Sequence, residues 1–160
     1  MRENYKIYCD MDGVLVDFNR QFENLSGGMY SRTYEETYGK NNFWKLIKSE
    51  GIEFWSGMRW MVDGQDLWNF IESPTTELLS APSIEESSRI GKARWVGKNL
   101  PGVILNLEYA KDKKKFAGPN NILIDDHPKN ISDWVEFGGI GILHTSTSNT
   151  INELKKLFNE

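Results

Sequence analysis

The sequence predicts an α/β fold, a doubly wound parallel sheet with helices on both faces. From residue 75 onward, short β-rich apolar runs alternate with segments of helical periodicity, which is the pattern of parallel crossover units. A length of 160 residues, with 39% hydrophobic and 26% charged residues, is typical of one compact globular domain. The chain carries no internal repeat or low-complexity tract that would indicate another architecture.

The first strand is expected at residues 5–11, a β-rich run that stops at the turn signal Asp12-Gly13. The next segment, residues 18–73, lacks strand alternation. Its apolar residues recur at helical spacing, and several glycines break the pattern. We interpret this segment as a small, mostly helical insertion.

The remaining elements alternate regularly. Strands are expected at residues 77–80, 103–107, 122–124 and 140–144, and helices at residues 85–99, 112–117, 131–137 and 151–158. Pro101-Gly102 is a stop signal after the first of these helices. The expected division is therefore an α/β core of residues 1–17 and 74–160, with a helical cap of residues 18–73 inserted after the first strand.

Charge and cysteine content exclude several classes of protein. A formal net charge of −4 and a pI near 5.3 disfavour a stable complex with nucleic acid. A single cysteine, Cys9, excludes an intramolecular disulfide framework and most cysteine-based metal sites.

No apolar run is long enough to span a bilayer, and the first residues do not resemble a signal peptide. We expect a cytoplasmic protein without a membrane partner.

Acidic residues gather where the expected strands end. Asp10 and Asp12 lie at the end of the first strand, and Asp125 and Asp126 follow the strand at 122–124. Ligands of open parallel sheets bind at the carboxyl ends of the strands, so these carboxylates are expected to converge. Close carboxylates repel one another unless a proton or a metal lies among them, and a ligand set made only of oxygens favours magnesium. The sequence therefore predicts a Mg²⁺ site.

The same residue types suit phosphoryl transfer. An aspartate can attack phosphorus to give an aspartyl-phosphate, and a second aspartate can protonate the leaving oxygen and then activate water. Ser80, at the end of the second expected strand, adds a hydroxyl at the same edge. A lysine from the basic run before the acidic pair would hold a phosphoryl oxygen. The spacing favours Lys115, and Lys113 and Lys114 remain the alternatives.

These residues, in this order, resemble the four motifs of the haloacid dehalogenase superfamily: Asp10-Met11-Asp12-Gly13, Ser80, Lys115 and Asp125-Asp126. Within it, the chain looks like the 5'(3')-deoxyribonucleotidases, on the segment 10–18, the pair Phe43-Trp44, the segment 80–82, the spacing from the lysine to the acidic pair, and Trp134 near the end. The resemblance covers most of the chain, although the insertion matches only in patches.

The resemblance implies a role for each matched polar residue. Asp10 would be the nucleophile and a Mg²⁺ ligand, and Asp12 the general acid/base, with its backbone carbonyl also on the metal. Asp126 would be the direct metal ligand among the acidic pair, with Asp125 beside it or acting through water. Ser80 and Lys115 would bind the phosphoryl group.

The resemblance also assigns the aromatic residues of the insertion. Phe18, Phe43 and Trp44 match positions that surround the nucleoside in the family, and Phe54 and Trp55 are expected to help close the pocket. The implied activity is Mg²⁺-dependent hydrolysis of nucleoside 5'-monophosphates, above all deoxyribonucleotides, to nucleoside and phosphate. Relatives form homodimers, but no interface can be recognised in the sequence.

Other functions remain open. One is a phosphatase for another phosphomonoester, such as a sugar phosphate or a polynucleotide 3' end, although acidity and aromatic content disfavour a polynucleotide. Another is a nucleotide-binding protein without turnover, which would have no need of the second aspartate. The chain also departs from the family at Ala81 and at His127-Pro128-Lys129, and its insertion is shorter. Base and sugar preference are therefore not carried over.

Overall fold

A computed structural model describes all 160 residues and places a five-stranded sheet at the centre of the molecule. The strands are β1 (Lys6–Cys9), β2 (Glu77–Ser80), β3 (Leu105–Leu107), β4 (Asn121–Asp125) and β5 (Ile140–Leu143). They lie in the order β3-β2-β1-β4-β5, and every neighbouring pair is parallel. The predicted α/β fold is confirmed.

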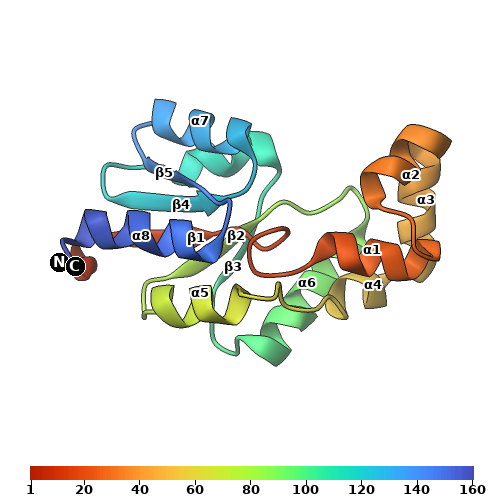
Figure 1. The fold of residues 1–160 in the computed structure, drawn as a ribbon, viewed down its shortest axis with the longest axis horizontal. Helices are drawn as coiled ribbons and strands as arrows, with labels where there is room; N and C mark the ends of the chain where they lie inside the picture. Colours follow the sequence, from red (N-terminus) through yellow and green to blue (C-terminus); the bar gives the residue numbers. More distant parts are fainter.

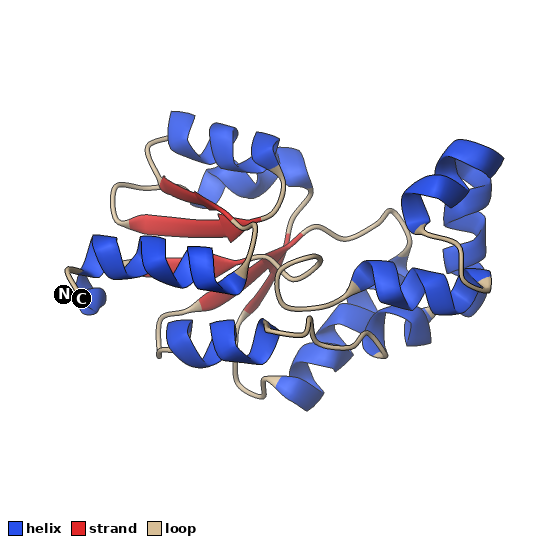
Figure 2. Ribbon diagram, viewed as in Figure 1, coloured by secondary structure: helices blue, strands red, loops and turns tan.

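The helices follow in chain order around this sheet (Figures 1 and 2). They are η1 (Arg2–Asn4), α1 (Phe18–Ser26), α2 (Ser31–Tyr38), α3 (Lys40–Glu50), α4 (Ile52–Ser56), α5 (Gly64–Ile71), α6 (Glu86–Asn99), η2 (Ala110–Phe116), α7 (Pro128–Glu136) and α8 (Thr147–Phe158). None of them combines the length and apolarity that crossing a membrane would require.

Alternation along the strands explains why both faces of the sheet are covered. Ile7 and Cys9 of β1 belong to the larger apolar cluster, whereas Tyr8 between them belongs to a second cluster on the opposite face. Trp134 of α7 packs against that second face, with its ring 5.6 Å from the ring of Tyr8. Successive side chains of a strand point to opposite faces, so β1, β2 and β4 contribute to both clusters.

The inserted segment does not form one separate unit. Helices α1 to α4 extend away from the carboxyl ends of the strands, as Figure 1 shows. Helix α5 instead lies beside α8, and its Leu67, Trp68 and Ile71 are buried in the larger cluster. The expected cap of residues 18–73 is thus corrected at its end. Its last helix, α5, packs against α8 of the core, because the apolar side chains of α5 are buried in the larger cluster.

The cap is fastened to the core through α4 and α6. A Cβ atom on Gly91 of α6 would lie 2.4 Å from Cβ of Trp55 and 2.7 Å from the carbonyl oxygen of Ile52, so only glycine permits this approach. The larger apolar cluster continues from the sheet into the cap, where it includes Phe22 and Phe43. The cap and the core therefore share one hydrophobic interior.

Candidate active site

The chain turns sharply where β1 ends, and this turn brings two aspartates to the edge of the sheet. The amide N–H of Asp10 still donates to the carbonyl of Ile124 on β4 at 2.9 Å, which fixes its position beside that strand. Gly13 has a φ of 78°, and a Cβ atom there would lie 2.1 Å from Oδ2 of Asp126. A glycine is required at this position for the acidic residues of the two strands to approach each other.

Three carboxylates meet at this edge. Asp10, Asp125 and Asp126 each offer an oxygen, and these oxygens lie within 4.8 Å of one another. The pKa of Asp10 is raised to about 8, first by burial and also by the nearby carboxylates of Asp125, Asp12 and Asp126, although Lys113 offsets part of the effect. The pKa of Asp126 is also raised, first by loss of hydration and then by Asp125. The cluster therefore holds more negative charge than its protein partners neutralise.

Asp125 is oriented by three donors. Its Oδ1 accepts the backbone N–H of His127 at 2.9 Å, and its Oδ2 accepts Nζ of Lys113 at 2.8 Å and Nδ2 of Asn130 at 3.1 Å. Asp126 has no such partners. The roles that the resemblance implies, with Asp126 as the direct metal ligand and Asp125 beside it, remain a prediction.

A divalent cation fits this cluster. The donors are all carboxylate oxygens, which Mg²⁺ and other hard cations prefer. Burial, and after it the neighbouring carboxylates, raise the pKa values of Asp10 and Asp126, and a bound cation would favour their ionised forms. Asp10 and Asp126 have the free oxygens that would hold it. The side chain of Asp12 lies outside the three-carboxylate group, because it is directed to a lysine instead.

The lysine at the cluster is Lys113, and the assignment to Lys115 is corrected. Nζ of Lys113 lies 3.1 Å from Oδ1 of Asp10 and is buried. Lys115 is exposed and pairs with Asp112 on the surface. The segment is a 3-10 helix, and its geometry directs Lys113 inward and Lys115 outward. Lys113 is one of the two alternatives, with Lys114, that the sequence leaves open.

A second buried lysine escaped the sequence analysis. Nζ of Lys92, on α6, donates to Oδ2 of Asp12 at 2.7 Å, to Oγ of Ser80 at 2.7 Å and to the carbonyl of Ala81 at 2.9 Å. Its three protons are therefore all engaged by the protein. Lys92 fixes Asp12 and Ser80 in place, and because it donates to Ser80, the hydroxyl proton of Ser80 is free for another acceptor.

Asp12 retains one unused acceptor. Its Oδ2 accepts Lys92, whereas Oδ1 is buried and has no hydrogen-bond partner in the protein. Buried polar atoms are nearly always paired, and exceptions gather at functional sites. The free oxygen of Asp12 is therefore available for a proton or a substrate group.

Two cavities open from this edge. The smaller, about 460 Å³, is lined by the acidic residues and Lys113; the larger, about 920 Å³, lies between the cap and the core. Both are lined by Asp12, Phe18, Asn19 and Ala81. We call the smaller one the acidic chamber, the larger one the cap cavity, and these four shared residues the throat. The two cavities therefore adjoin each other at these four residues.

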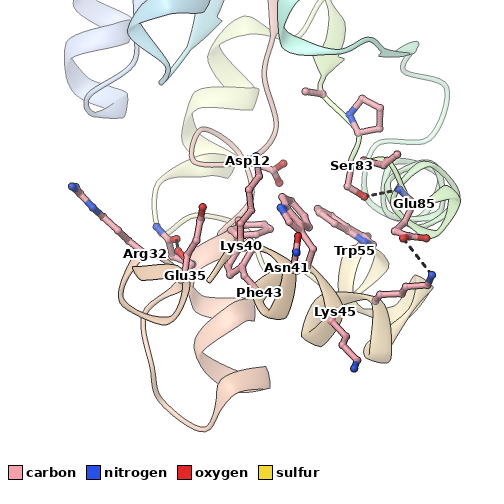
Figure 3. Close-up of a pocket in the computed structure, with 18 of the residues that line it drawn as sticks. Asp12, Arg32, Glu35, Lys40, Asn41, Phe43, Lys45, Trp55, Ser83 and Glu85 are labelled. Atoms are coloured by element: carbon pink, nitrogen blue, oxygen red, sulfur yellow. Dashed lines mark hydrogen bonds and ion pairs between the residues drawn. The ribbon is translucent and has the colours of Figure 1, made fainter. Parts of the chain in front are cut away.

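The predicted aromatic residues line the cap cavity, which Figure 3 shows in close-up. Phe18, Phe43, Trp44 and Trp55 all line it. The ring of Phe18 lies 6.4 Å from that of Phe43 and 5.8 Å from that of Trp55. Phe54 does not line the cavity; it is fully buried behind Phe18 and supports that ring from the core, so its expected place in the pocket is corrected.

Comparison with known proteins identifies the fold. A hydrolase from Streptococcus pneumoniae TIGR4 is 15% identical, with 98% of this chain and 100% of that chain covered and a TM-score of 0.58. A dehalogenase is 11% identical over 96% of both chains with a TM-score of 0.55. A HAD family hydrolase from Deinococcus radiodurans R1, with bound phosphate and sodium, is 12% identical over 93% of this chain and 87% of that chain, with a TM-score of 0.53.

Sequence comparison adds no closer relative. No family model matches the chain, and no curated protein is similar to it in sequence. The chain thus has the fold of the haloacid dehalogenase (HAD) hydrolases, at a level of identity that establishes the architecture alone.

Proposed function

We propose that this chain, built on the fold of the HAD hydrolases, is a magnesium-dependent phosphomonoesterase that hydrolyses (deoxy)nucleoside 5'-monophosphates through an aspartyl-phosphate. The observation that carries the proposal is the junction of the two cavities. The acidic chamber, which is lined by Asp10 and Lys113, adjoins the aromatic cap cavity at the four residues of the throat. A phosphate group suits the first, and an aromatic base suits the second.

The first step uses Asp10 as the nucleophile. A carboxylate oxygen of Asp10 attacks phosphorus and the bond to the leaving oxygen breaks, which gives an aspartyl-phosphate. Lys113 donates to both Asp10 and Asp125, so one of its three protons remains for a phosphoryl oxygen. A bound Mg²⁺, held by Asp10 and Asp126, would supply positive charge against the phosphoryl oxygens.

Asp12 is the general acid and then the general base. Its free Oδ1 would carry the proton that the departing 5' oxygen takes, and it would later accept a proton from the attacking water. Lys92 holds the other oxygen of Asp12, which keeps the side chain directed toward the throat. The hydroxyl of Ser80, held by the same lysine, is free to donate to the phosphoryl group.

The leaving group would be recognised in the cap cavity. Phe18, Phe43, Trp44 and Trp55 offer aromatic faces on which a base can stack, and such faces accept every base with little discrimination. A bound phosphate and sodium in the HAD family hydrolase from Deinococcus radiodurans support the class of chemistry, although they leave the substrate of this chain to experiment.

The test is phosphate release from a panel of ribo- and deoxyribonucleoside 5'-monophosphates, with Mg²⁺ and with EDTA. The Asp10→Asn variant is the negative control, and Asp66→Asn, an exposed aspartate on α5, is the matched control. Metal-dependent release that disappears only in Asp10→Asn supports the proposal. Cleavage of an aryl phosphate without cleavage of any nucleotide would retain the chemistry and refute the substrate. Binding of nucleotides without any release would refute the enzyme.

A further inference from the structure

The throat between the two cavities has a distinct composition. Of the four residues that line both cavities, Phe18 and Ala81 are apolar, and Asp12 is committed to Lys92 and to the leaving oxygen. Asn19 is therefore the one polar side chain of the throat that the proposed chemistry does not use. It lies in the first turn of α1.

The amide of Asn19 is oriented by a neighbour. Oγ of Ser31, the first residue of α2, donates to Oδ1 of Asn19 at 2.7 Å. This bond occupies the amide oxygen, whereas Nδ2 of Asn19 makes no hydrogen bond in the protein and keeps both of its protons. Ser31 also lines the cap cavity, and its hydroxyl oxygen can accept one further bond. The pair thus offers a donor and an acceptor beside the throat.

We propose that Asn19 and Ser31 form a binding site for a hydroxyl of the leaving group's sugar, and that the hydroxyl is the 3' one. The inference rests on the proposed function. With the phosphoryl group in the acidic chamber and the base in the cap cavity, the pentose occupies the throat. Its apolar face meets Phe18 and Ala81, and its hydroxyl nearest the ester linkage meets Asn19.

The 3' hydroxyl is common to ribo- and deoxyribonucleotides, so this site selects for an intact sugar and leaves the 2' position undecided. Nδ2 of Asn19 loses this partner when the hydroxyl is absent, and a site built to hydrogen-bond a substrate hydroxyl discriminates against an analogue that lacks it. The preferred substrate class is therefore a phosphomonoester whose leaving group carries a free hydroxyl close to the carbon that bears the phosphate ester.

The experiment compares two substrates in several variants. One is a 2'-deoxynucleoside 5'-monophosphate, and the other is the 2',3'-dideoxy form with the same base. Values of kcat/KM are measured for the wild type, Asn19→Ala and Ser31→Ala. Asn24→Ala, an exposed asparagine on the same helix α1, is the matched control, and p-nitrophenyl phosphate reports on the phosphoryl chemistry alone.

We expect the wild type and Asn24→Ala to favour the deoxy substrate by about tenfold, the scale of one hydrogen bond. In Asn19→Ala that ratio falls close to one, because kcat/KM drops for the deoxy substrate only. Ser31→Ala gives an intermediate ratio, since the amide loses its orienting partner. Cleavage of p-nitrophenyl phosphate is unchanged throughout.

Two results would overturn the inference. If Asn19→Ala lowers kcat/KM for both nucleotides equally, the bond between Asn19 and Ser31 only joins α1 to α2. If the wild type does not distinguish the two nucleotides, the throat does not read the 3' hydroxyl. Failure of the proposed function looks different: the wild type then cleaves p-nitrophenyl phosphate and neither nucleotide, and the inference falls with it.

Discussion

Nζ of Lys113 lies 3.1 Å from Oδ1 of Asp10, and both groups are buried at the edge of the sheet. Burial opposes the charge on the lysine, yet the carboxylates of Asp10 and Asp125 raise its pKa above the ordinary range. Burial also favours the neutral form of Asp10, which could not attack phosphorus. Lys113 is therefore the protein group that favours the ionised form of Asp10, which the proposed nucleophilic role requires.

Replacing this lysine is the first test of the site. We expect Lys113→Met to lower kcat/KM by about 10²–10³, because a preorganised charge on the reacting groups is lost. Removal of one partner from a buried ion pair also costs about 3–5 kcal/mol of stability in many proteins, which urea unfolding will measure. Lys113→Arg retains the charge and serves if the first variant does not fold.

The matched control is Lys115→Met, two residues along the same 3-10 helix. The lysine is exposed, and its pair with Asp112 is of the surface type, which contributes between about 0 and 1 kcal/mol. We expect activity and stability close to those of the wild type. Loss of activity in this variant, with normal activity in Lys113→Met, would restore the assignment that the spacing favoured.

Asp12→Asn separates the two chemical steps. A nucleoside 5' oxygen needs a proton to depart, so we expect turnover of nucleotides to fall by about 10²–10⁴. The p-nitrophenolate ion departs without a proton, so that substrate should still give a rapid burst of about one equivalent as the aspartyl-phosphate accumulates. Stopped-flow absorbance measures the burst. Its absence, with equal losses on both substrates, would contradict the acid role of Asp12.

Mg²⁺ is expected to stabilise the folded protein in the absence of substrate. A ligand at 100 times its Kd adds about 2.7 kcal/mol to the free energy of unfolding, and calorimetry with and without the metal measures this. Asp126→Asn removes one of the free carboxylates and should weaken the effect. Asp66→Asn should respond as the wild type does. An equal response in all three proteins would place the cation elsewhere.

Two glycines of α6 are expected to respond in opposite directions. Gly91→Ala places a Cβ atom 2.4 Å from Cβ of Trp55, so it should destabilise the protein by about 1–3 kcal/mol. A Cβ on Gly97 meets nothing within 4 Å, so Gly97→Ala should stabilise the helix by up to about 1 kcal/mol. Urea unfolding compares them. Equal effects would mean that α4 does not pack on α6 at Gly91.

Titration of the buried His144 imidazole is expected to cause part of the pH dependence of stability. Burial lowers its pKa below the usual value of 6.5, partly offset by Asp63, while Nδ1 lies 2.8 Å from Oγ1 of Thr150. Below pH 6.5 the unfolded chain therefore binds a proton that the folded one resists, and stability is lost as the pH falls toward the folded pKa. We expect the contribution of His144 to the free energy of unfolding to drop between pH 7.5 and 5, while the raised pKa of Asp10 acts in the opposite direction.

The variant His144→Gln should lose less stability over this interval than the wild type, after correction for its own value at pH 7.5. His127→Gln, in which the replaced ring is exposed, should follow the wild type. Chemical unfolding at a series of pH values measures both. A variant curve parallel to that of the wild type would show that another group causes the loss.

The sequence predicts the acidic chamber well because its residues follow directly from strand ends. Asp10 and Asp125 are adjacent in space since β1 and β4 are adjacent parallel strands. The choice among the lysines could not be made in the same way. Side chains of a 3-10 helix repeat every three residues rather than every 3.6, so the inward position depends on a helix type that the basic run does not reveal.

Lys92 was missed for a related reason. A lysine in a helix is normally solvated, so its charge indicated the outer face of α6. The available signal was its register: Ser88 lies four residues before it and Trp95 three residues after it, and both are buried. A charged residue within such a stripe needs a partner of opposite charge, here Asp12.

The place of α5 was also beyond the sequence. Leu67, Trp68 and Ile71 form an apolar stripe that suits a cap interior and a sheet face equally. Only the tertiary arrangement, in which α5 lies against α8, distinguishes the two. The aromatic lining, in contrast, was recognised through family resemblance, and Phe18, Phe43, Trp44 and Trp55 do share one cavity.

Gly91 and Lys92 are consecutive residues with partners on different sides of the cavities. The first receives Trp55 of the cap, and the second holds Asp12 and Ser80 of the core. A single peptide unit thus connects the residue on which the cap packs, Gly91, with the residue that holds Asp12, Lys92. Exchanging the cap for that of another protein with this fold would disturb Asp12, the proposed acid/base group, unless this stretch of α6 were redesigned together with it.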